Sequence, residues 1–477
     1  MTLARKLTTN VGYAVAGRLA SAVFGLATTA IMARQLGPEF FGAFRTAFAW
    51  GVLCCTLANL GLVVVCLQEI SRDGADKRRI VGTALGLRLL FGAFCILLSA
   101  GIAWFVPLSE AIGPLQMSCA TAIAALGAVA TLGHEVVATI FQQSLTQKRA
   151  SIAEFAGGTA TLGFTLLAVL IDGGLLAFTT AITSGLVVTT LCAVLLAEKL
   201  TPVRPQLDLP LARRMIVSGL PLFGSEAVGM ITSRLDTVLL SVLSIATQVG
   251  YYGAAGKIRE MAVRFPYMFA MLLMPILTSR VSEPREFRRF LADALVVTWI
   301  FGVAVIVGLA RYADLIVALL AGPKYTGAIP AVQLTGVAVA VTAMAAILQY
   351  AAYALDRSGA ALKAKTVSAV AALIAMLVLI PGHGAVGTMA AVTIGELLFA
   401  LMLMPHATPD GQPAVPWRRL ALVCIVGLLA AGVALTLKAL DVPRYLRIIA
   451  VVMAYPLLLL AFRVTSLAQL RALTAKA

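Results

Sequence analysis

The sequence predicts an all-α protein that crosses a membrane many times. Of its 477 residues, 61% are hydrophobic and 12% are charged, whereas a soluble globular protein is about 45–50% apolar and about 25% charged. Apolar runs of the roughly 20 residues that a helix needs to cross the hydrocarbon core recur along the whole chain. The longest polar stretches, near residues 198–214 and 405–419, are rich in proline and arginine. They are interpreted as linkers, so the function is expected to lie within the membrane region.

Hydropathy and chain-breaking residues divide the chain into about fourteen transmembrane helices. The first apolar run follows Arg5 and Lys6, as in a signal peptide, but Arg18 interrupts it and no convincing cleavage site follows. It is therefore expected to be an uncleaved first helix. Gly37 and Pro38 separate it from the second helix, and an outer loop is expected there. The predicted helices are residues 10–33, 43–66, 80–104, 114–141, 151–171, 174–197, 215–243, 251–279, 290–310, 325–355, 366–381, 384–404, 420–437 and 445–462.

The positions of lysine and arginine predict the orientation of these helices. If the chain starts in the cytoplasm, the cytoplasmic termini and loops hold 24 of the 37 basic residues and the opposite loops hold six. This is a positive-inside distribution, so both termini are expected to be cytoplasmic. Most of the net charge of +16 then reflects insertion and lipid headgroups, and nucleic acid is not expected as a partner. The six basic residues on the outer side are Arg34, Arg311, Lys324, Lys438, Arg444 and Arg447.

Two sequence echoes indicate an internal repeat. "FFGAF" at residues 40–44 is echoed by "YYGAA" at 251–255, and "SLTQKRA" at 144–150 is echoed by "ALDRSGA" at 354–360. Both offsets are close to 210 residues, which corresponds to six predicted helices, so the two copies keep the same orientation. The predicted organisation is two parallel six-helix lobes with an additional C-terminal helix pair. Their predicted boundaries are 1–200, 213–405 and 418–463.

Three stretches resemble the multidrug/oligosaccharidyl-lipid/polysaccharide (MOP) exporter superfamily, in particular its polysaccharide or O-antigen flippase branch. They are "ARQLGPEFFGAF" at 33–44, "LANLGLVVVCLQEISR" at 57–72 and "DTVLLSVLSIATQVGYYGAAGKI" at 236–258. The helix count and the repeat extend the resemblance over nearly the whole chain. The resemblance implies two lobes around a central cavity that opens alternately to either side of the membrane and moves a lipid-linked oligosaccharide between leaflets.

Charged residues within the predicted helices are the candidate substrate site. A charge near the bilayer centre costs about 2.5–3.5 kcal/mol on insertion scales, so each is expected to face a partner or a wet cavity. Arginine pairs bidentately with phosphate oxygens and lysine supplies a point charge, so a cationic cavity fits a pyrophosphate. The alternative is that these cations neutralise Glu260 and other buried acids as structural pairs. The candidate cations are Arg18, Arg88, Arg234, Lys257 and Arg264.

Energy coupling and gating have their own candidates. "GYYGAAGKI" at 250–258 departs from a phosphate-binding loop, because five residues separate its outer glycines and Ile258 replaces Ser or Thr. Coupling to H⁺ or Na⁺ through a buried carboxylate is therefore considered. The candidate carboxylates are Glu135, Glu226, Asp236 and a lone Glu396. Arg34 and Glu39 form either an outer gate pair or a solvated loop, and the turn residues Gly37, Pro38 and Gly42 include a hinge as the alternative.

The sequence thus predicts a flippase that moves an undecaprenyl-pyrophosphate-linked oligosaccharide repeat unit across a bacterial inner membrane by alternating access during polysaccharide export. A lipid II flippase is the close alternative, and a cation-coupled multidrug exporter would need an acid-dominated, aromatic cavity. An enzyme is not expected, because neither an acidic catalytic motif nor a sizeable extramembrane loop is present. The scattered histidines and cysteines predict no metal site, and no cofactor is expected. The expected partners are the lipid-linked substrate, membrane lipids, and a polysaccharide polymerase and assembly proteins.

Overall fold

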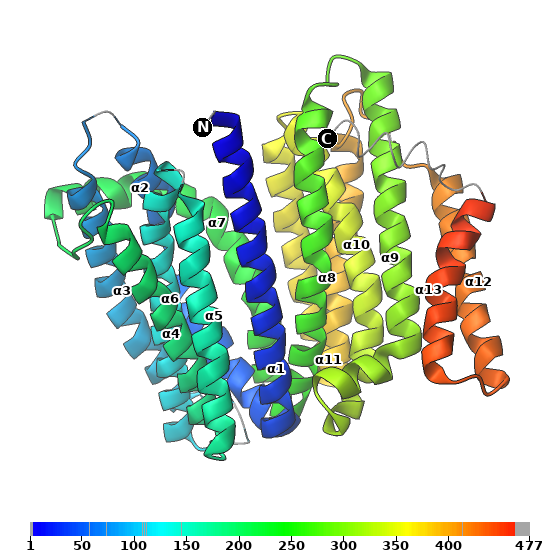
Figure 1. Ribbon diagram of the computed structural model, residues 1–477, viewed down its shortest axis with the longest axis horizontal. Coiled ribbons are helices and arrows are strands. Elements are labelled where there is room, and N and C mark those ends of the chain that lie inside the picture. Colours follow the sequence, from blue (N-terminus) through cyan, green and yellow to red (C-terminus); the bar gives the residue numbers. More distant parts are fainter. Residues whose placement is uncertain are drawn as a thin grey trace. The chain divides into compact units, whose positions relative to one another are not determined.

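The chain is helical along its length in a computed structural model (Figure 1). The structure describes residues 3–462 except 57, 73, 107, 109, 111, 145 and 413, and it leaves out the side chains of residues 3–16, 18–20, 22, 221–222 and 224–233. The described residues form thirteen α-helices and two 3-10 helices, with no β-strand among them. Ten of the helices in this part of the chain are long and apolar enough to cross a membrane. The predicted all-α, multi-pass class is confirmed.

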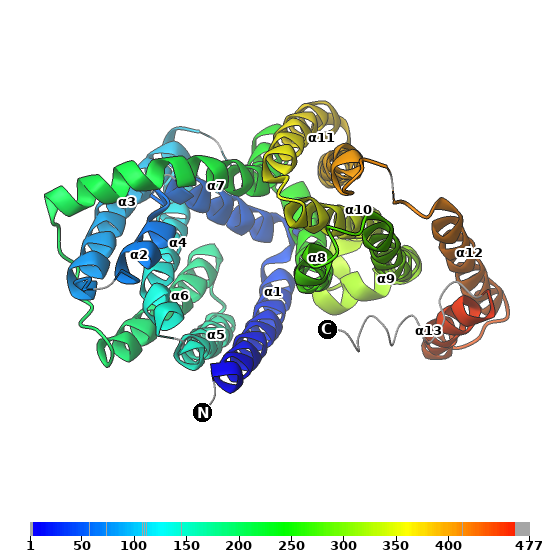
Figure 2. The same cartoon turned by 90° about the horizontal axis from the view of Figure 1, so that it is seen from above.

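The first compact unit contains Met1–Gly253 and Leu320–Lys324. Within it, α5 and α6 run side by side, and α4 packs against α1, α3 and α6 (Figures 1 and 2). Its core joins Val65, Leu85 and Phe141, which come from three of these helices. The helices of this unit are α1 Leu3–Thr56, α2 Leu62–Ile70, α3 Lys77–Phe105, α4 Pro114–Gln143, α5 Gln147–Leu170, α6 Leu175–Glu198 and α7 Leu209–Leu243.

Local sequence sets where several of these helices begin. Asp76 precedes α3 and its carboxylate accepts the N–H of Arg79 at 3.1 Å, while Asp208 precedes α7 and accepts the N–H of Leu211 at 3.1 Å. Aspartate is a preferred residue at this position because it satisfies an N–H that has no partner within the helix. The N–H of Leu211 and the neighbouring Arg79 guanidinium hold the pKa of Asp208 below its usual range. The two caps therefore agree with the predicted starts of the helices to within a few residues.

The expected outer loop between the first two helices is wrong. Two helical segments of α1 meet there at a kink, and only Gly37 leaves the helical conformation, with φ 71° and ψ 174°. Glycine adopts this positive φ without the steric cost that a Cβ imposes, and Pro38 then suits the first position of the following helical segment. Arg34 and Glu39 consequently lie on helical turns on either side of a sharp bend. One glycine thus replaces the loop that the hydropathy pattern predicts.

Glycines with positive φ also mark two other places in the predicted helices. The helix predicted over 43–66 is broken, because Leu60 and Gly61 have positive φ values of 49° and 65° between α1 and α2. The helices predicted over 366–381 and 384–404 are both present, as the two segments of α11, Ser358–Leu403, which meet at a kink where Gly384 alone is non-helical. At both places a glycine takes a positive φ angle that hydropathy does not record.

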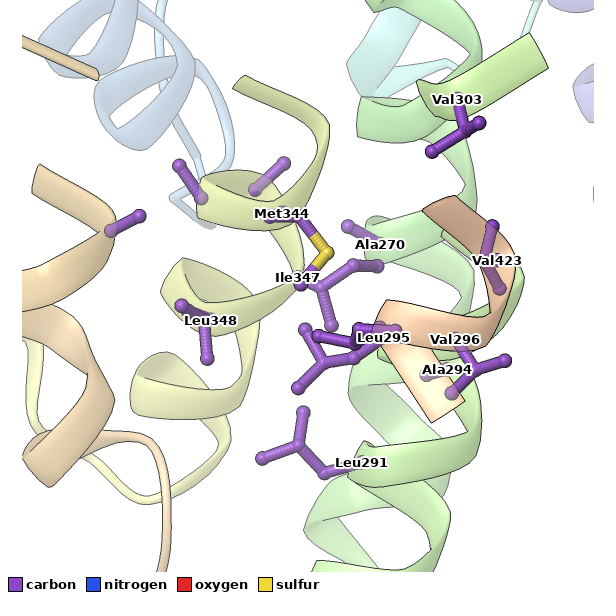
Figure 3. Close-up of a cluster of buried hydrophobic side chains, with 14 of the residues drawn as sticks. Ala270, Leu291, Ala294, Leu295, Val296, Val303, Met344, Ile347, Leu348 and Val423 are labelled. Atoms are coloured by element: carbon purple, nitrogen blue, oxygen red, sulfur yellow. The ribbon is translucent and has the colours of Figure 1, made fainter. Parts of the chain in front are cut away.

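The second compact unit contains Ala254–Leu319 and Tyr325–Ala477. Figure 3 shows its core, where Ala270 of α8, Leu295 of α9 and Met344 of α10 meet Val423 of α12. The Tyr455 hydroxyl of α13 donates to the carbonyl of Ile300 in α9 at 2.9 Å. Helices α12 and α13 therefore pack against the other helices of this unit. The remaining elements of the chain have the bounds α8 Ala246–Thr278, α9 Pro284–Leu320, η1 Pro323–Ala328, α10 Ile329–Ala354, η2 Met404–His406, α12 Trp417–Ala439 and α13 Arg444–Ala461.

The packing of helix α7 differs from its place in the predicted lobes. It packs against α1, α2 and α3 within the first unit, although the repeat places its sequence at the start of the second lobe. The lobe boundaries 1–200, 213–405 and 418–463 rest on the sequence echoes and stay a prediction.

The predicted orientation can be tested by labelling cysteines from outside the cell. Gly382 has open space around its Cα and is exposed, so Gly382→Cys is tolerated sterically, whereas a cysteine at Gly37 would be strained by its positive φ. An impermeant thiol reagent should modify Gly382→Cys and spare Pro284→Cys at the exposed start of α9. The background carries Cys119→Ser, since Cys119 is the exposed native cysteine among the described residues. Labelling of Pro284→Cys from outside would contradict the predicted orientation and indicate the opposite one.

Candidate substrate-binding site

Three charged residues of α8 form a continuous row, here called the α8 stripe: Lys257, Glu260 and Arg264. They are three and four residues apart, so they share one helix face. Glu260 lies between the cations, with Oε2 3.2 Å from Lys257 Nζ and Oε1 2.7 Å from an Arg264 guanidinium nitrogen. The side chains of Glu260 and Arg264 are about half exposed, at 48% and 46%. The stripe therefore offers one surplus positive charge on an accessible surface.

A second charged group, here called the Glu396 cluster, joins α8 to α11. Glu396 Oε1 lies 3.0 Å from Lys365 Nζ and 4.0 Å from a guanidinium nitrogen of Arg259. Lys365 Nζ also lies 4.5 Å from the centre of the Phe399 ring, a cation–π contact. Glu396 is the one charged residue of the predicted helix 384–404, and two cations from other helical segments neutralise it. Its role in ion coupling stays a prediction.

Lys365 is not among the candidate cations predicted from the sequence, because it directly precedes the predicted helix 366–381. The bend at Gly384 turns the second half of α11 back along the first, so that Lys365 reaches Glu396 and Ser368 lies beside Gly395. In a helical hairpin, contacting residues have numbers that add to a nearly constant value. Such contacts could therefore be predicted from the sequence only if the two predicted helices were known to be antiparallel neighbours.

Three tyrosines lie near the Glu396 cluster. Tyr267 of α8 lies within electrostatic range of Glu396 and Arg259 and of Tyr350 and Tyr353 of α10. The rings of Tyr350 and Tyr353 meet edge to face at 5.8 Å. The Tyr353 hydroxyl also accepts a hydrogen bond of 2.7 Å from the amide of Gln349. These residues could not be predicted from the sequence, because tyrosines in apolar helices carry no spacing pattern of their own.

Arg88, the candidate cation on α3, is buried, with 1% of its surface exposed. One guanidinium nitrogen donates to Asn59 Oδ1 at 2.9 Å. Asn59 lies at the break between α1 and α2, where an unwound backbone brings the amide next to the arginine. In this conformation Arg88 holds the break together, and its role in binding substrate stays a prediction.

The remaining candidates fall in the first unit. Asp236 accepts a hydrogen bond from the Tyr252 hydroxyl at 2.5 Å and from the backbone N–H of Thr237 at 2.6 Å. Arg234 is exposed, and Glu135 is partly buried on α4. Arg34 and Glu39 are both exposed, and the Arg34 side chain lies beside Gly322. The side chains of Arg18 and Glu226 lie outside the described residues, so the cationic role of the first and the coupling role of the second stay predictions.

The start of the first echoed motif contacts the stretch just before the second, at what we call the glycine crossing: residues 38–42 of α1 and 246–250 of α8. A Cβ on Gly42 would lie 1.8 Å from the Ala246 carbonyl oxygen, and one on Gly250 would lie 1.9 Å from the Pro38 carbonyl oxygen. The two backbones are in direct contact, which small residues permit between membrane helices. Gly42 is therefore a packing residue within a helix, and its interpretation as a turn residue is wrong. Its hinge role stays a prediction.

The side chains of the α8 stripe and the Glu396 cluster, with the nearby tyrosines, are suited to bind phosphates and sugars. Ammonium and guanidinium groups bind phosphate oxygens, and tyrosine hydroxyls and amides exchange hydrogen bonds with sugar hydroxyls. Within the described part of the chain, no three histidine, cysteine or carboxylate side chains come together as metal ligands.

Comparison with known proteins gives the family. The family model described as "Polysaccharide biosynthesis protein" matches residues 7–281. No curated protein sequence matches the chain.

Solved structures share the fold at low sequence identity. The lipid II flippase MurJ in an inward closed conformation is 14% identical, with a TM-score of 0.78 over 95% of this chain and 99% of MurJ. An inward-facing MATE family multidrug resistance transporter of the MOP superfamily is 15% identical, with a TM-score of 0.66 over 84% of this chain and 95% of the transporter. The MATE multidrug transporter DinF-BH is 16% identical, with a TM-score of 0.54 over 84% of this chain and 94% of its own.

The family match spans more than half of the chain and the structural matches extend over most of the rest. The chain belongs to the polysaccharide biosynthesis protein family, and it shares its fold with the lipid II flippase MurJ and with MATE family transporters.

Proposed function

We propose that this protein flips an undecaprenyl-pyrophosphate-linked oligosaccharide repeat unit across the bacterial inner membrane, by alternating access, during polysaccharide export. The observation that carries the proposal is the surplus of cations on α8 and α11. The α8 stripe and the Glu396 cluster together contain four cations, Lys257, Arg259, Arg264 and Lys365, and two carboxylates. All of them lie on helices long and apolar enough to span the membrane.

A surplus of charge in membrane helices calls for a polar ligand. Charged residues in such helices almost always face the protein interior or a water-filled cavity, because exposure to hydrocarbon is costly. A pyrophosphate supplies several anionic oxygens, and Arg264 can bind two of them through its planar fork while Lys257 adds a point charge. The tyrosines around Glu396 offer hydroxyls and ring faces for the attached sugars.

Two alternatives use the same fold. MurJ is named as a lipid II flippase, and lipid II would present a similar pyrophosphate to the same cations. The match to the polysaccharide biosynthesis family favours an oligosaccharide repeat unit over lipid II. A multidrug exporter for cationic compounds is disfavoured, because the α8 stripe and the Glu396 cluster carry a net positive charge.

Coupling to H⁺ or Na⁺ belongs to the same proposal, and Asp236 is the better placed of the described carboxylates. Its oxygens accept hydrogen bonds from neutral hydroxyl and amide groups, whereas cations already neutralise Glu396. A carboxylate that is not committed to an ion pair can take up a proton or a sodium ion as the conformation changes. The proposed orientation has both termini in the cytoplasm, and a polysaccharide polymerase and assembly proteins would receive the product.

Reconstitution tests the proposed substrate. The purified chain is placed in liposomes with a fluorescent undecaprenyl-pyrophosphate oligosaccharide, with lipid II, or with a cationic dye, and the arrival of each compound in the opposite leaflet is followed. We expect flipping of the oligosaccharide lipid to exceed that of lipid II by about tenfold or more, a difference of about 1.4 kcal/mol in the transport barrier. Faster movement of lipid II, or movement of the dye alone, would contradict the proposed substrate.

A further inference from the structure

Three of the six basic residues on the predicted outer side converge at the ends of α9 and α13, helices labelled in Figure 1. The ion pair between Arg444 of α13 and Asp314 of α9, at 2.5 Å, brings the start of α13 to this part of α9. The residues Arg311, Tyr312, Arg444 and Arg447 lie close enough to interact electrostatically. We call these four residues the outer arginine cluster. Such a concentration of cations runs against the positive-inside rule, which leaves outer ends of helices poor in arginine. Insertion topology therefore does not explain it.

The backbone brings the cluster together. Tyr312 departs from helical geometry, with φ −129° and ψ 18°, and bends α9 at this point. Gln333 of α10 supports the bend by donating to the Ala310 carbonyl at 3.3 Å. Arg444 and Arg447 lie in the first turn of α13, three residues apart and hence on one helix face. The positive end of the α13 dipole points to the same place and adds to the field of the arginines.

The cluster has more donors than acceptors. Asp314 pairs with Arg444 at 2.5 Å, so this pair is neutral and Arg311 and Arg447 remain in excess. The Nε atoms of both, and the Tyr312 hydroxyl, are buried and have no hydrogen-bond partner among the residues that the structure describes. Like charges repel strongly where water is scarce, so the arrangement favours an anion that accepts hydrogen bonds from these groups.

An apolar cavity of about 390 Å³ adjoins the cluster. It is lined by Ile258 and Ala262 of α8, Leu309 and Gly308 of α9, and Ile448 of α13. Tyr312 also lines it, so one side chain belongs both to the cavity and to the outer arginine cluster. The volume lies in the range of pockets that hold small ligands, about 300–1,000 Å³. A ligand here would have an apolar part in the cavity and an anionic part at the arginines.

We propose that the outer arginine cluster binds the phosphodiester headgroup of an anionic phospholipid whose acyl chain occupies the adjoining cavity. The site goes beyond the proposed transport function, since it uses neither the α8 stripe nor the Glu396 cluster. A phospholipid unites the two required parts, whereas free inorganic phosphate would leave the cavity unused. The two surplus positive charges favour an anionic headgroup over a zwitterionic one, because the ammonium of a zwitterion is repelled.

Lipid binding to the purified full chain tests the site, with native mass spectrometry on mixtures of phosphatidylglycerol and phosphatidylcholine of equal chain length. The native chain should retain phosphatidylglycerol about tenfold more tightly than phosphatidylcholine, as expected for one or two arginines at a membrane surface. Arg311→Gln with Arg447→Gln should abolish this preference. Lys324→Gln with Lys438→Gln removes two exposed charges on the same predicted side and should keep it.

The cavity is tested separately by Gly308→Leu. Gly308 lines the cavity and has no atoms within 4 Å of the position of an added Cβ, so a leucine side chain is expected to extend into the cavity. Gly163→Leu on α5, where the space is equally open, is the matched control. Gly308→Leu should weaken retention of phosphatidylglycerol by about tenfold, from loss of acyl contacts worth about 0.8 kcal/mol per methylene, and the control should not.

Three results would overturn the proposal. The first is an unchanged lipid preference in the Arg311/Arg447 variant. The second is unchanged binding in Gly308→Leu. The third is release of bound phosphatidylglycerol by inorganic phosphate at equal concentration, which would mark an anion site without a lipid. Because the variants leave Lys257 and Arg264 intact, flipping of the oligosaccharide lipid can be measured in the same samples, so failure of the lipid site is distinguishable from failure of the transport proposal.

Discussion

Replacing Lys257 and Arg264 together with glutamine is expected to abolish polysaccharide export while the protein still accumulates in the membrane. Arg264 and Glu260 are about half exposed, and exposed ion pairs contribute only about 0–1 kcal/mol to stability. Charge-assisted hydrogen bonds to a bound phosphate are worth about 1.5–3 kcal/mol each, so losing both cations should weaken binding by more than about a hundredfold. Replacing the cations of the α8 stripe should therefore weaken binding without preventing folding, whereas replacing fully buried cations would affect both.

The measurement is the amount of surface polysaccharide relative to the amount of the protein in the membrane, in cells that depend on this transporter. Glu260→Gln is the variant to compare with the double replacement, because it leaves both cations in place and should preserve export. If the stripe were only a structural ion pair, Glu260→Gln would be as harmful as the double replacement. Arg72→Gln is the matched control, since Arg72 forms an exposed pair with Glu69 at 2.8 Å away from the stripe. Normal export from the Lys257/Arg264 variant would rule out the pyrophosphate role.

Arg264→Lys is expected to recover export only in part, because lysine keeps the charge and loses the two-pronged geometry. Glu260 lies one turn away from Arg264 and makes its ion pair.

A methyl group added at the glycine crossing is expected to have the largest effect of any conservative substitution. In Gly250→Ala the new Cβ would lie 1.9 Å from the Pro38 carbonyl oxygen. Backbone atoms must move to relieve such a contact, and overpacking of this kind typically costs about 1–3 kcal/mol or more. A loss of this size lowers the amount of folded protein several-fold. We expect both membrane abundance and export to fall sharply.

Gly256→Ala provides the matched control, because it lies in the same stretch of sequence and has no atoms within 4 Å of the added Cβ. Its abundance and export should equal those of the native protein. Gly42→Ala, on the opposing helix, should reproduce the defect of Gly250→Ala, since its Cβ would lie 1.8 Å from the Ala246 carbonyl oxygen. Native abundance in Gly250→Ala would show that the two backbones are not in contact in the membrane.

Local patterns account for what could be predicted. Hydropathy placed most of the predicted helices within a few residues of a described helical segment, because the thickness of the hydrocarbon core sets their length. The main exception, residues 43–66, is interrupted where Leu60 and Gly61 take positive φ values. The α8 stripe could also be predicted, since its residues are neighbours on successive turns of one helix.

Contacts between distant residues could not be predicted in this way. Lys365 meets Glu396 because α11 bends at Gly384, and Arg88 meets Asn59 because α1 ends before it. The Tyr252 hydroxyl reaches Asp236 across the junction of α7 and α8. Each pair depends on backbone angles at one or two residues, and a change of φ there redirects every side chain that follows.

The sequence by itself determined the fold class and the surplus of basic residues in membrane helices, because both follow from composition and from the length of apolar runs. Only the tertiary structure decided which charges are neutralised. Arg264 pairs with Glu260 within one helix, Glu396 is neutralised by cations from two segments, and Arg311 and Arg447 are left in excess around Tyr312. The physical reason is that the energy of a charge in a membrane protein depends on its partners within a few ångströms. Those partners are set by how the helices bend and pack.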